Sequence, residues 1–165
     1  MIINNVDCKV LKTFDNLGSG FCSNTMMFVQ LKDKTYQAVH KSGSRYAFLK
    51  KDDVQSELDY ALEALDEIKK ALSVFDNTFK YEKTQDKTLN ISGKDYQVIE
   101  KFYVYYQGWE CDSEGYIVKE TNSDKIQIAL TNHGSLYISS LNEMKDFQDT
   151  YNEVKKEYEE MLALM

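Results

Sequence analysis

Residues 33–46 read DKTYQAVHKSGSRY, and residues 124–137 read DKIQIALTNHGSLY. The two stretches lie 91 residues apart and are identical at six positions, among them an Asp-Lys pair, a Gly-Ser pair and a final tyrosine. In both, two hydrophobic runs flank a turn that contains glycine, and a long charged segment follows. An internal repeat determines the architecture of a chain, so it is the first pattern to interpret. This pair predicts two copies of one structural unit.

Weaker matches extend the repeat towards lower residue numbers. Residues 7–14, DCKVLKTF, resemble residues 95–102, DYQVIEKF, at an offset of 88. The drift of the offset from 88 to 91 requires three inserted residues, which loops accommodate. Chance agreement between short hydrophobic stretches is the alternative interpretation, but the matches keep their order along the chain.

Periodicity predicts the elements of each copy. Alternation of apolar and polar residues is typical of strands, and apolar residues at spacings of three and four are typical of helices. We expect four strands in each half, at residues 6–14, 25–31, 35–40 and 45–49, and at residues 96–106, 116–119, 125–130 and 135–139. A helix follows each set, with apolar stripes formed by Val54, Leu58, Ala61, Leu65, Ile68, Leu72 and Phe75, and by Met144, Phe147, Tyr151, Val154, Tyr158, Met161 and Met165.

Two capping patterns predict where these helices begin. Asp52 with Gln55 three residues later can form a capping box, and Ser140 with Glu143 has the Ser-x-x-Glu form of the same motif. One sheet face and one helix stripe make a thin core, so the two copies are expected to share one. The predicted fold is α+β, with two ββββα repeats forming a pseudo-two-fold single domain of antiparallel sheets and two long amphipathic helices. The repeats cover residues 1–78 and 94–165, and residues 79–93 form a linker or a short pair of strands.

Composition favours a folded, intracellular binding protein. The 165 residues include twelve Tyr, eight Phe and no Pro, and 42% are hydrophobic. The first residues lack the pattern of a signal peptide, and no run of about 18 apolar residues predicts a membrane span. Three widely spaced cysteines, Cys8, Cys22 and Cys111, are typical of free buried thiols in a reducing cytoplasm. We expect the cytoplasm of a bacterial or infected host cell.

Motifs for catalysis or metal binding are not apparent. His40 and His133 lie in no His-x-x-x-His or Cys-x-x-Cys setting, so a zinc site is not predicted. No Gly-x-Ser-x-Gly turn indicates a nucleophile. Residues 15–20, DNLGSG, lack the Lys-Ser/Thr of a phosphate-binding loop. The sequence therefore favours a non-catalytic protein without a cofactor or metal.

Charge is unevenly distributed along the chain. The net charge is −7, but residues 1–51 carry eight basic and three acidic groups, whereas residues 52–82 carry three and nine. Proteins that bind single-stranded nucleic acid combine a basic groove with aromatic side chains on which bases stack. The alternative is that these aromatic residues pack in the core. The candidate binding residues are Lys12, Lys32, Lys34, Tyr36, Lys41, Arg45, Tyr46, Tyr103, Tyr105 and Trp109.

The tandem order of four strands and a helix resembles that of the Whirly and Pur-alpha repeat proteins. The resemblance covers nearly the whole chain but consists of element order alone, without a diagnostic motif. It implies single-stranded DNA or RNA binding through the sheet surface. Two alternatives remain open: a small acidic phage-type inhibitor or adaptor that binds a basic surface of a host protein, such as a nucleic-acid enzyme, and a structural or assembly subunit. The pattern fits a monomer or a homo-oligomer.

Overall fold

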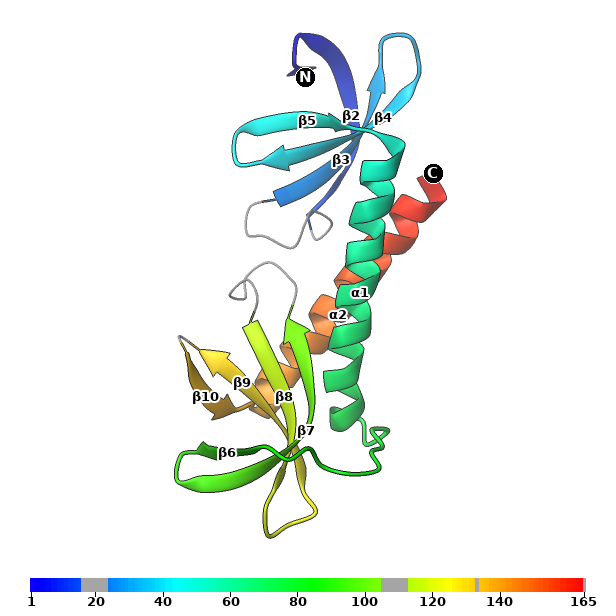
Figure 1. Ribbon diagram of the computed structural model, residues 1–165. Helices are drawn as coiled ribbons and strands as arrows, with labels where there is room; N and C mark the ends of the chain where they lie inside the picture. The colour runs from blue at the N-terminus through cyan, green and yellow to red at the C-terminus, as the bar shows by residue number, and fades with distance from the viewer. Residues whose placement is uncertain (16–23, 105–112, 133, 165) are drawn as a thin grey trace. The chain divides into compact units, whose positions relative to one another are not determined.

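The computed structural model describes residues 1–15, 24–104, 113–132 and 134–164 and has the predicted α+β composition (Figure 1). Each of its two sheets is antiparallel, and its five strands lie in sequence order. Sheet 1 consists of β1 (Ile2–Ile3), β2 (Val6–Phe14), β3 (Asn24–Leu31), β4 (Tyr36–Ser42) and β5 (Arg45–Leu49), and α1 (Lys51–Phe75) follows it. Sheet 2 consists of β6 (Thr88–Ile91), β7 (Lys94–Val104), β8 (Ser113–Glu120), β9 (Ile126–Asn132) and β10 (Ser135–Ile138), and α2 (Leu141–Leu164) follows it.

Each sheet has one strand more than the four that the sequence predicts. The additional strands are β1 and β6, both short and joined to the next strand by a two-residue turn. Asn4 and Asn5 form the first turn, and Ser92 and Gly93 form the second, all with positive φ. Such turns match the twist of a hairpin. The prediction missed β1, because two residues are too few to show an alternation, and it gave the region of β6 as a linker or a short pair of strands.

The chain divides into two compact units, which are described separately. Among the described residues, the first unit contains 1–63 and 153–164, and the second contains 64–104 and 113–152. Each unit therefore holds one complete sheet, the first part of the helix that follows it, and the last part of the other helix.

Sheet 1 buries apolar side chains on both faces. We call the face that carries Phe14, Met26 and Ala38 its helix face. These residues form a buried cluster with Val54, Leu58 and Ala61 of α1 and Met161 of α2. The opposite face, called the far face, carries a second cluster formed by Ile3, Cys8, Met27, Val29 and Val39. Sheet 2 has a comparable far-face cluster, formed by Ile91, Tyr96, Val98, Tyr116, Val118 and Ala129.

The two sheets share local irregularities at equivalent places, which is consistent with two repeats. The pairing of β2 with β3 shifts register between Val10 and Lys12. The pairing of β7 with β8 shifts between Val98 and Glu100, 88 residues later. A β-bulge is a specific local feature that bends a strand. Its recurrence at the offset of the first sequence match supports that match.

Strand pairing corrects the second match. In sheet 1, Phe28 pairs with Ala38, and in sheet 2, Ile117 pairs with Ile128. Ala38 is thus equivalent to Ile128, at an offset of 90 rather than 91. A shift of one residue moves a side chain to the other face of a sheet. The predicted match of Ala38 with Ala129 is therefore wrong, and the pairing requires two inserted residues rather than three.

Equivalent contacts join each sheet to the final part of the helix that follows the other sheet. In the first unit, the Asp15 backbone N–H donates to Glu157 Oε1 at 3.0 Å, and Lys12 forms an ion pair with Glu160. In the second unit, the Tyr103 N–H donates to Glu67 Oε2 at 2.9 Å. There, Lys70 Nζ lies 3.3 Å from Glu100 Oε1.

The start of α2 is as predicted, whereas that of α1 is not. The Glu143 N–H donates to Ser140 Oγ at 3.3 Å, and the Ser140 N–H donates to Glu143 Oε1 at 3.2 Å, which confirms the capping box. The helix α1 begins before Asp52, and Asp53 accepts from the Lys50 N–H at 3.1 Å. Lys50 therefore stands at the N-cap instead of Asp52, and Asp53 takes the role that the prediction assigned to Gln55.

Gly115 provides a test of packing in the second unit. It pairs with Phe102 across β7 and β8, and a Cβ at Gly115 would overlap the Phe102 ring. We expect Gly115→Ala to lower the free energy of unfolding by about 1–3 kcal/mol, the usual cost of overpacking. Chemical denaturation measures this. Thr88→Ala, at an exposed strand residue, is the control. Equal stability of both variants would contradict this position of Phe102.

Candidate nucleic-acid interface

The β3–β4 hairpin places two aromatic rings together on the helix face of sheet 1. Phe28 and Tyr36 share this face because Gln30 pairs with Tyr36 and Phe28 pairs with Ala38. The ring centroids lie 5.6 Å apart with an interplanar angle of 4°, so the rings are stacked. Tyr36 is 57% exposed, and its hydroxyl accepts a hydrogen bond from Gln30 Nε2 at 3.4 Å. The stack therefore presents aromatic surface to solvent.

The turn of this hairpin positions two lysines. Asp33 Oδ1 accepts from the Thr35 N–H at 2.9 Å and from the Thr35 hydroxyl at 2.5 Å. The Lys34 N–H donates to the Leu31 carbonyl at 3.0 Å, and Lys34 has a φ of +72°. This left-handed conformation is unusual for a residue other than glycine, asparagine or aspartate. Lys32 and Lys34 thus lie on either side of Asp33, the carboxylate that stabilises the turn.

A pocket of about 310 Å³ lies beside this turn. Its basic residues are Lys9, Lys32 and Lys34, and Asp7 contributes a carboxylate. Lys32 Nζ lies 3.4 Å from Asp7 Oδ2, whereas Lys9 and Lys34 have no ion pair within the described parts of the chain. We call this the lysine pocket. Three ammonium groups and one carboxylate leave an excess of positive charge, which favours an anion.

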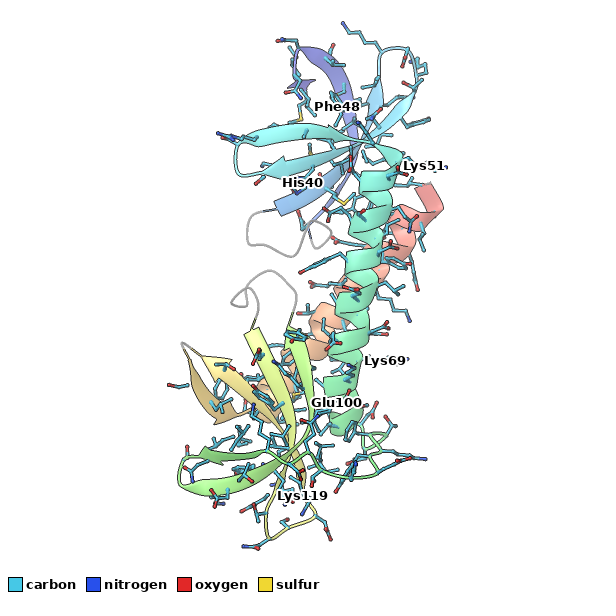
Figure 2. All side chains as sticks on the ribbon, viewed as in Figure 1. His40, Phe48, Lys51, Lys69, Glu100 and Lys119 are labelled. Atoms are coloured by element: carbon cyan, nitrogen blue, oxygen red, sulfur yellow. The ribbon has the colours of Figure 1, made fainter. Side chains whose placement is uncertain are left out.

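A second pocket, of about 190 Å³, adjoins the aromatic stack and is called the aromatic pocket. Lys51, at the start of α1 in Figure 2, is the one charged residue among the described residues that line it. Its remaining lining consists of Phe28, Tyr36, Gln37, Ala38, Leu49, Val54 and Met161. This pocket thus combines an aromatic wall with a single cationic donor.

The structure brings together only part of the predicted site. Lys32, Lys34 and Tyr36 lie at one end of the β3–β4 hairpin. Lys12 shares the helix face but is ion-paired with Glu160. Arg45 pairs with Ser42 at the other end of β4, about 20 Å from Tyr36 at the usual rise of a strand.

The other predicted residues lie elsewhere. Tyr46 packs against the far-face cluster of sheet 1, and Lys41 Nζ lies 5.8 Å from its ring centroid. Tyr103 belongs to the second unit, where it is 38% exposed. Tyr105 and Trp109 are outside the described residues.

The sequence prediction did not include Lys9, Phe28, Gln30 or Lys51. The sheet face of Lys9 and Phe28 could be predicted from strand alternation, which puts Lys9 on the opposite face from Cys8 and Phe28 on the opposite face from Met27. Their place beside Tyr36 depends on the strand register, which periodicity alone does not give. The position of Lys51 beside the aromatic stack could not be predicted without knowing where α1 packs on sheet 1.

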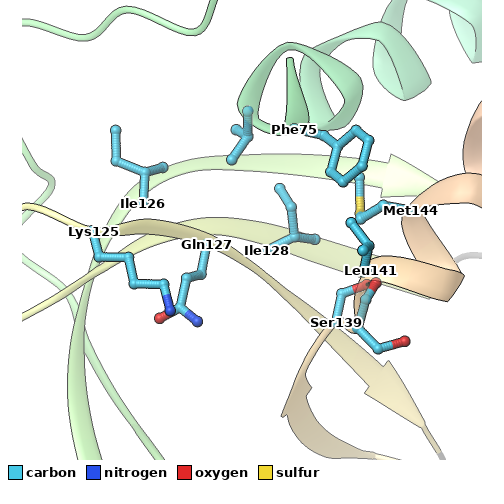
Figure 3. A pocket seen from close by; sticks show the side chains of 10 residues that line it. Phe75, Lys125, Ile126, Gln127, Ile128, Ser139, Leu141 and Met144 are labelled. Carbon is cyan, nitrogen blue, oxygen red and sulfur yellow. Dashed lines mark hydrogen bonds between the residues drawn. The ribbon is translucent and has the colours of Figure 1, made fainter. Parts of the chain in front are cut away.

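The second unit has a pocket at the equivalent place, but its chemistry differs. Figure 3 shows this pocket, of about 340 Å³, with Phe75, Ile128 and Met144 among its apolar lining residues. Ile126 takes the place of Tyr36, and Leu141, which is 59% exposed, takes that of Lys51. Sheet 2 also has Gln97 where sheet 1 has Lys9, and Thr121 where it has Lys32. This pocket has a cationic and an aromatic lining residue of its own, Lys125 and Phe75, but neither stands at the position of Lys51 or Tyr36.

The far face of sheet 2 carries a charged aromatic cluster. Lys101 Nζ lies 2.6 Å from Glu114 Oε1, and the Tyr116 hydroxyl donates to Glu114 Oε2 at 2.9 Å. The bond from Lys101, followed by that from Tyr116, lowers the pKa of Glu114 below its ordinary value. Because Lys101 is neutralised here, this cluster attracts anions less than the lysine pocket does.

Among the described residues, no group of three or more His, Cys, Asp or Glu side chains is arranged to hold a metal ion. No helix in the described ranges is long and apolar enough to span a bilayer. Cys8 is a buried free thiol, and Cys22 and Cys111 lie outside the described residues.

The Asp33 turn gives a pH-dependent prediction. Hydrogen bonds from the Thr35 hydroxyl and N–H lower the pKa of Asp33. The ionised carboxylate therefore stabilises the turn above the ordinary Asp pKa, and this support is lost as the pH falls through the lowered value. We expect an NMR titration of the Asp33 carboxyl carbon to have its midpoint below the ordinary value. Thr35→Val should raise the midpoint, and an identical midpoint in both proteins would contradict the bond.

Comparison with known proteins assigns no family. No family model, no characterised protein and no solved structure matches this chain. The resemblance of its element order to the Whirly and Pur-alpha proteins therefore stays a prediction.

Proposed function

We propose that the protein binds single-stranded nucleic acid through the helix face of sheet 1. The observation that carries this proposal is the exposed Phe28–Tyr36 stack beside the lysine pocket. Stacking on aromatic side chains and attraction of phosphates by lysines are the two interactions that such proteins combine. Both occur on one hairpin of the first unit.

Single strands suit this surface better than duplexes. Tyr36 presents a ring face to solvent. A base can stack on this ring only when the face of the base is not already stacked on a neighbouring base. In a duplex the bases are stacked on each other, and mainly phosphates and base edges are accessible. The exposed ring therefore favours an unstacked strand.

The net charge of −7 does not conflict with local attraction. Salt screens charges beyond about 8 Å at physiological ionic strength. Lys9 and Lys34 have no carboxylate partner among the described residues, so a phosphate in the lysine pocket would meet positive charge first. The acidic helix surfaces then affect affinity mainly at low salt.

The first test is the salt dependence of binding. Fluorescence anisotropy of labelled single-stranded DNA and RNA oligomers is measured at several salt concentrations between about 50 and 200 mM. Each phosphate contact contributes about −0.7 to the slope of log affinity against log salt for a single strand. Three lysines predict a slope of about −2. Absence of binding at the lowest salt would overturn the proposal.

A pair of variants with equal loss of charge tests the location. Lys34→Gly removes an ammonium group from a backbone position that suits glycine, so the fold should keep its stability. Arg45→Gln removes one positive charge at the far end of β4. We expect anisotropy to show a several-fold loss of affinity and a shallower salt slope for Lys34→Gly alone. Equal losses in both variants would indicate a non-specific charge effect instead.

A second candidate function is binding of a basic protein surface by α1. Within the first unit, Asp52, Asp59 and Glu63 are exposed on this helix and form no ion pair with other described residues. Such a row of carboxylates can attract a groove that normally binds phosphates. If oligonucleotides do not bind, competition with DNA for a nucleic-acid enzyme tests this function. The Asp59→Asn, Glu63→Gln double variant should then compete less well.

A further inference from the structure

We infer that the lysine pocket and the aromatic pocket hold one nucleotide between them, with its phosphate in the first and its base in the second. This inference rests on the proposed function and specifies how the strand is held. It assigns a separate role to each pocket and adds Lys51, which contacts neither the turn nor the lysine pocket, to the binding surface.

The two pockets are neighbours on the helix face. Gln30 lines the lysine pocket and donates to the hydroxyl of Tyr36, which lines the aromatic pocket. Phe28 and Gln30 are two residues apart on β3, about 7 Å at the usual rise of a strand. A single nucleotide spans a comparable distance between its phosphate and its base, so both groups can be accommodated together.

The aromatic pocket has the chemistry that a base requires. Phe28 and Tyr36 are stacked and supply a planar wall, while Ala38, Val54 and Met161 supply apolar surface. The Lys51 ammonium group donates hydrogen bonds and accepts none. It can therefore bind the carbonyl oxygens at the edges of guanine, cytosine, thymine and uracil, whereas adenine offers only ring nitrogens. We expect adenine to be the least favoured base.

The lysine pocket suits the phosphate for a different reason. Lys9 and Lys34 are free of ion pairs with other described residues, so a phosphate need not displace a carboxylate to reach them. Lys32 is engaged by Asp7 at 3.4 Å and can exchange this exposed partner for the phosphate. Exposed ion pairs are weak, so the exchange has little cost.

The second unit has a pocket at the equivalent place with different residues at the positions of Tyr36 and Lys51. Its equivalent pocket has Ile126 and Leu141 in place of Tyr36 and Lys51. The chain therefore contains natural replacements that are compatible with the same local fold. Tyr36→Ile and Lys51→Leu copy the second unit into the first and remove the stacking ring and the donor one at a time.

The experiment uses the full chain and a labelled single-stranded oligomer of mixed sequence. We expect Tyr36→Ile to weaken binding about 5- to 150-fold, the range for loss of one stacked base. Lys51→Leu should weaken binding several-fold and reduce the discrimination against oligo-adenine. The matched control is Leu141→Ala, at the equivalent residue of the second unit, which should leave affinity unchanged. Circular dichroism establishes that each variant is folded.

NMR then separates the two pockets with small probes. Inorganic phosphate should shift the amide signals of Lys9 and of Lys32 to Thr35, and not those of Ala38 or Lys51. Guanosine or uridine monophosphate should shift these signals and also those of Tyr36, Ala38 and Lys51. Shifts from the monophosphates that stay confined to the turn would overturn the assignment of the base to the aromatic pocket.

The outcomes distinguish this inference from the function on which it rests. Salt-dependent binding that is weakened by Lys34→Gly, Tyr36→Ile and Lys51→Leu supports both. Binding that is weakened by Lys34→Gly and Tyr36→Ile but unaffected by Lys51→Leu, with monophosphate shifts confined to the turn, overturns the two-pocket arrangement and keeps the proposed function. Absence of any oligomer binding at low salt overturns both.

Discussion

The register of the β3–β4 hairpin is the constraint on which the candidate site depends. It pairs Phe28 with Ala38, and so directs one set of side chains to the helices and the other to the far face. The same pairing puts Tyr36 beside Phe28 and leaves its ring exposed. A slip of one residue would send Tyr36 to the far face and Val39 to the helices. The Asp33–Thr35 bonds at the turn help to fix this register.

Much of the fold was accessible from the sequence because its signals are local. The helices and most strands follow from residue spacing, and Ser140 with Glu143 specifies the start of α2. The short strand β1 was missed, and β6 was one of two alternatives for residues 79–93, since the stability of both strands comes from pairing rather than from their own residues. The repeat was detected, but identical letters at Ala38 and Ala129 suggested the wrong register. The pseudo-two-fold arrangement and the amphipathic nature of the helices stay predictions.

The candidate site was harder to predict from the sequence, because it depends on which face of sheet 1 each side chain occupies rather than on the composition of a segment. Clusters of Lys and Tyr in residues 1–51 indicated the sheet that carries the candidate site. Sequence proximity cannot show that Lys41 and Tyr46 lie on the far face, or that Glu160 neutralises Lys12. Conversely, Lys9 and Lys51 join the surface through strand pairing and helix placement. Long-range contacts of this kind leave no local signature.

The ion pairs that join strands to helices are reversed between the two units: the strand residue is basic in the first unit and acidic in the second. Lys12 of β2 meets Glu160, whereas Glu100 of β7 meets Lys70. If each sheet instead received the final part of its own helix, Lys12 would face Lys70, and Glu100 would face Glu160. One exposed ion pair stabilises the fold by only about 0–1 kcal/mol, but two like charges in contact would destabilise it instead. If the two halves arose by duplication, this exchange of charges means that the helix of one half can no longer replace the helix of the other. A change of charge on a strand in one half then limits which charges are tolerated on the helix that follows the other half.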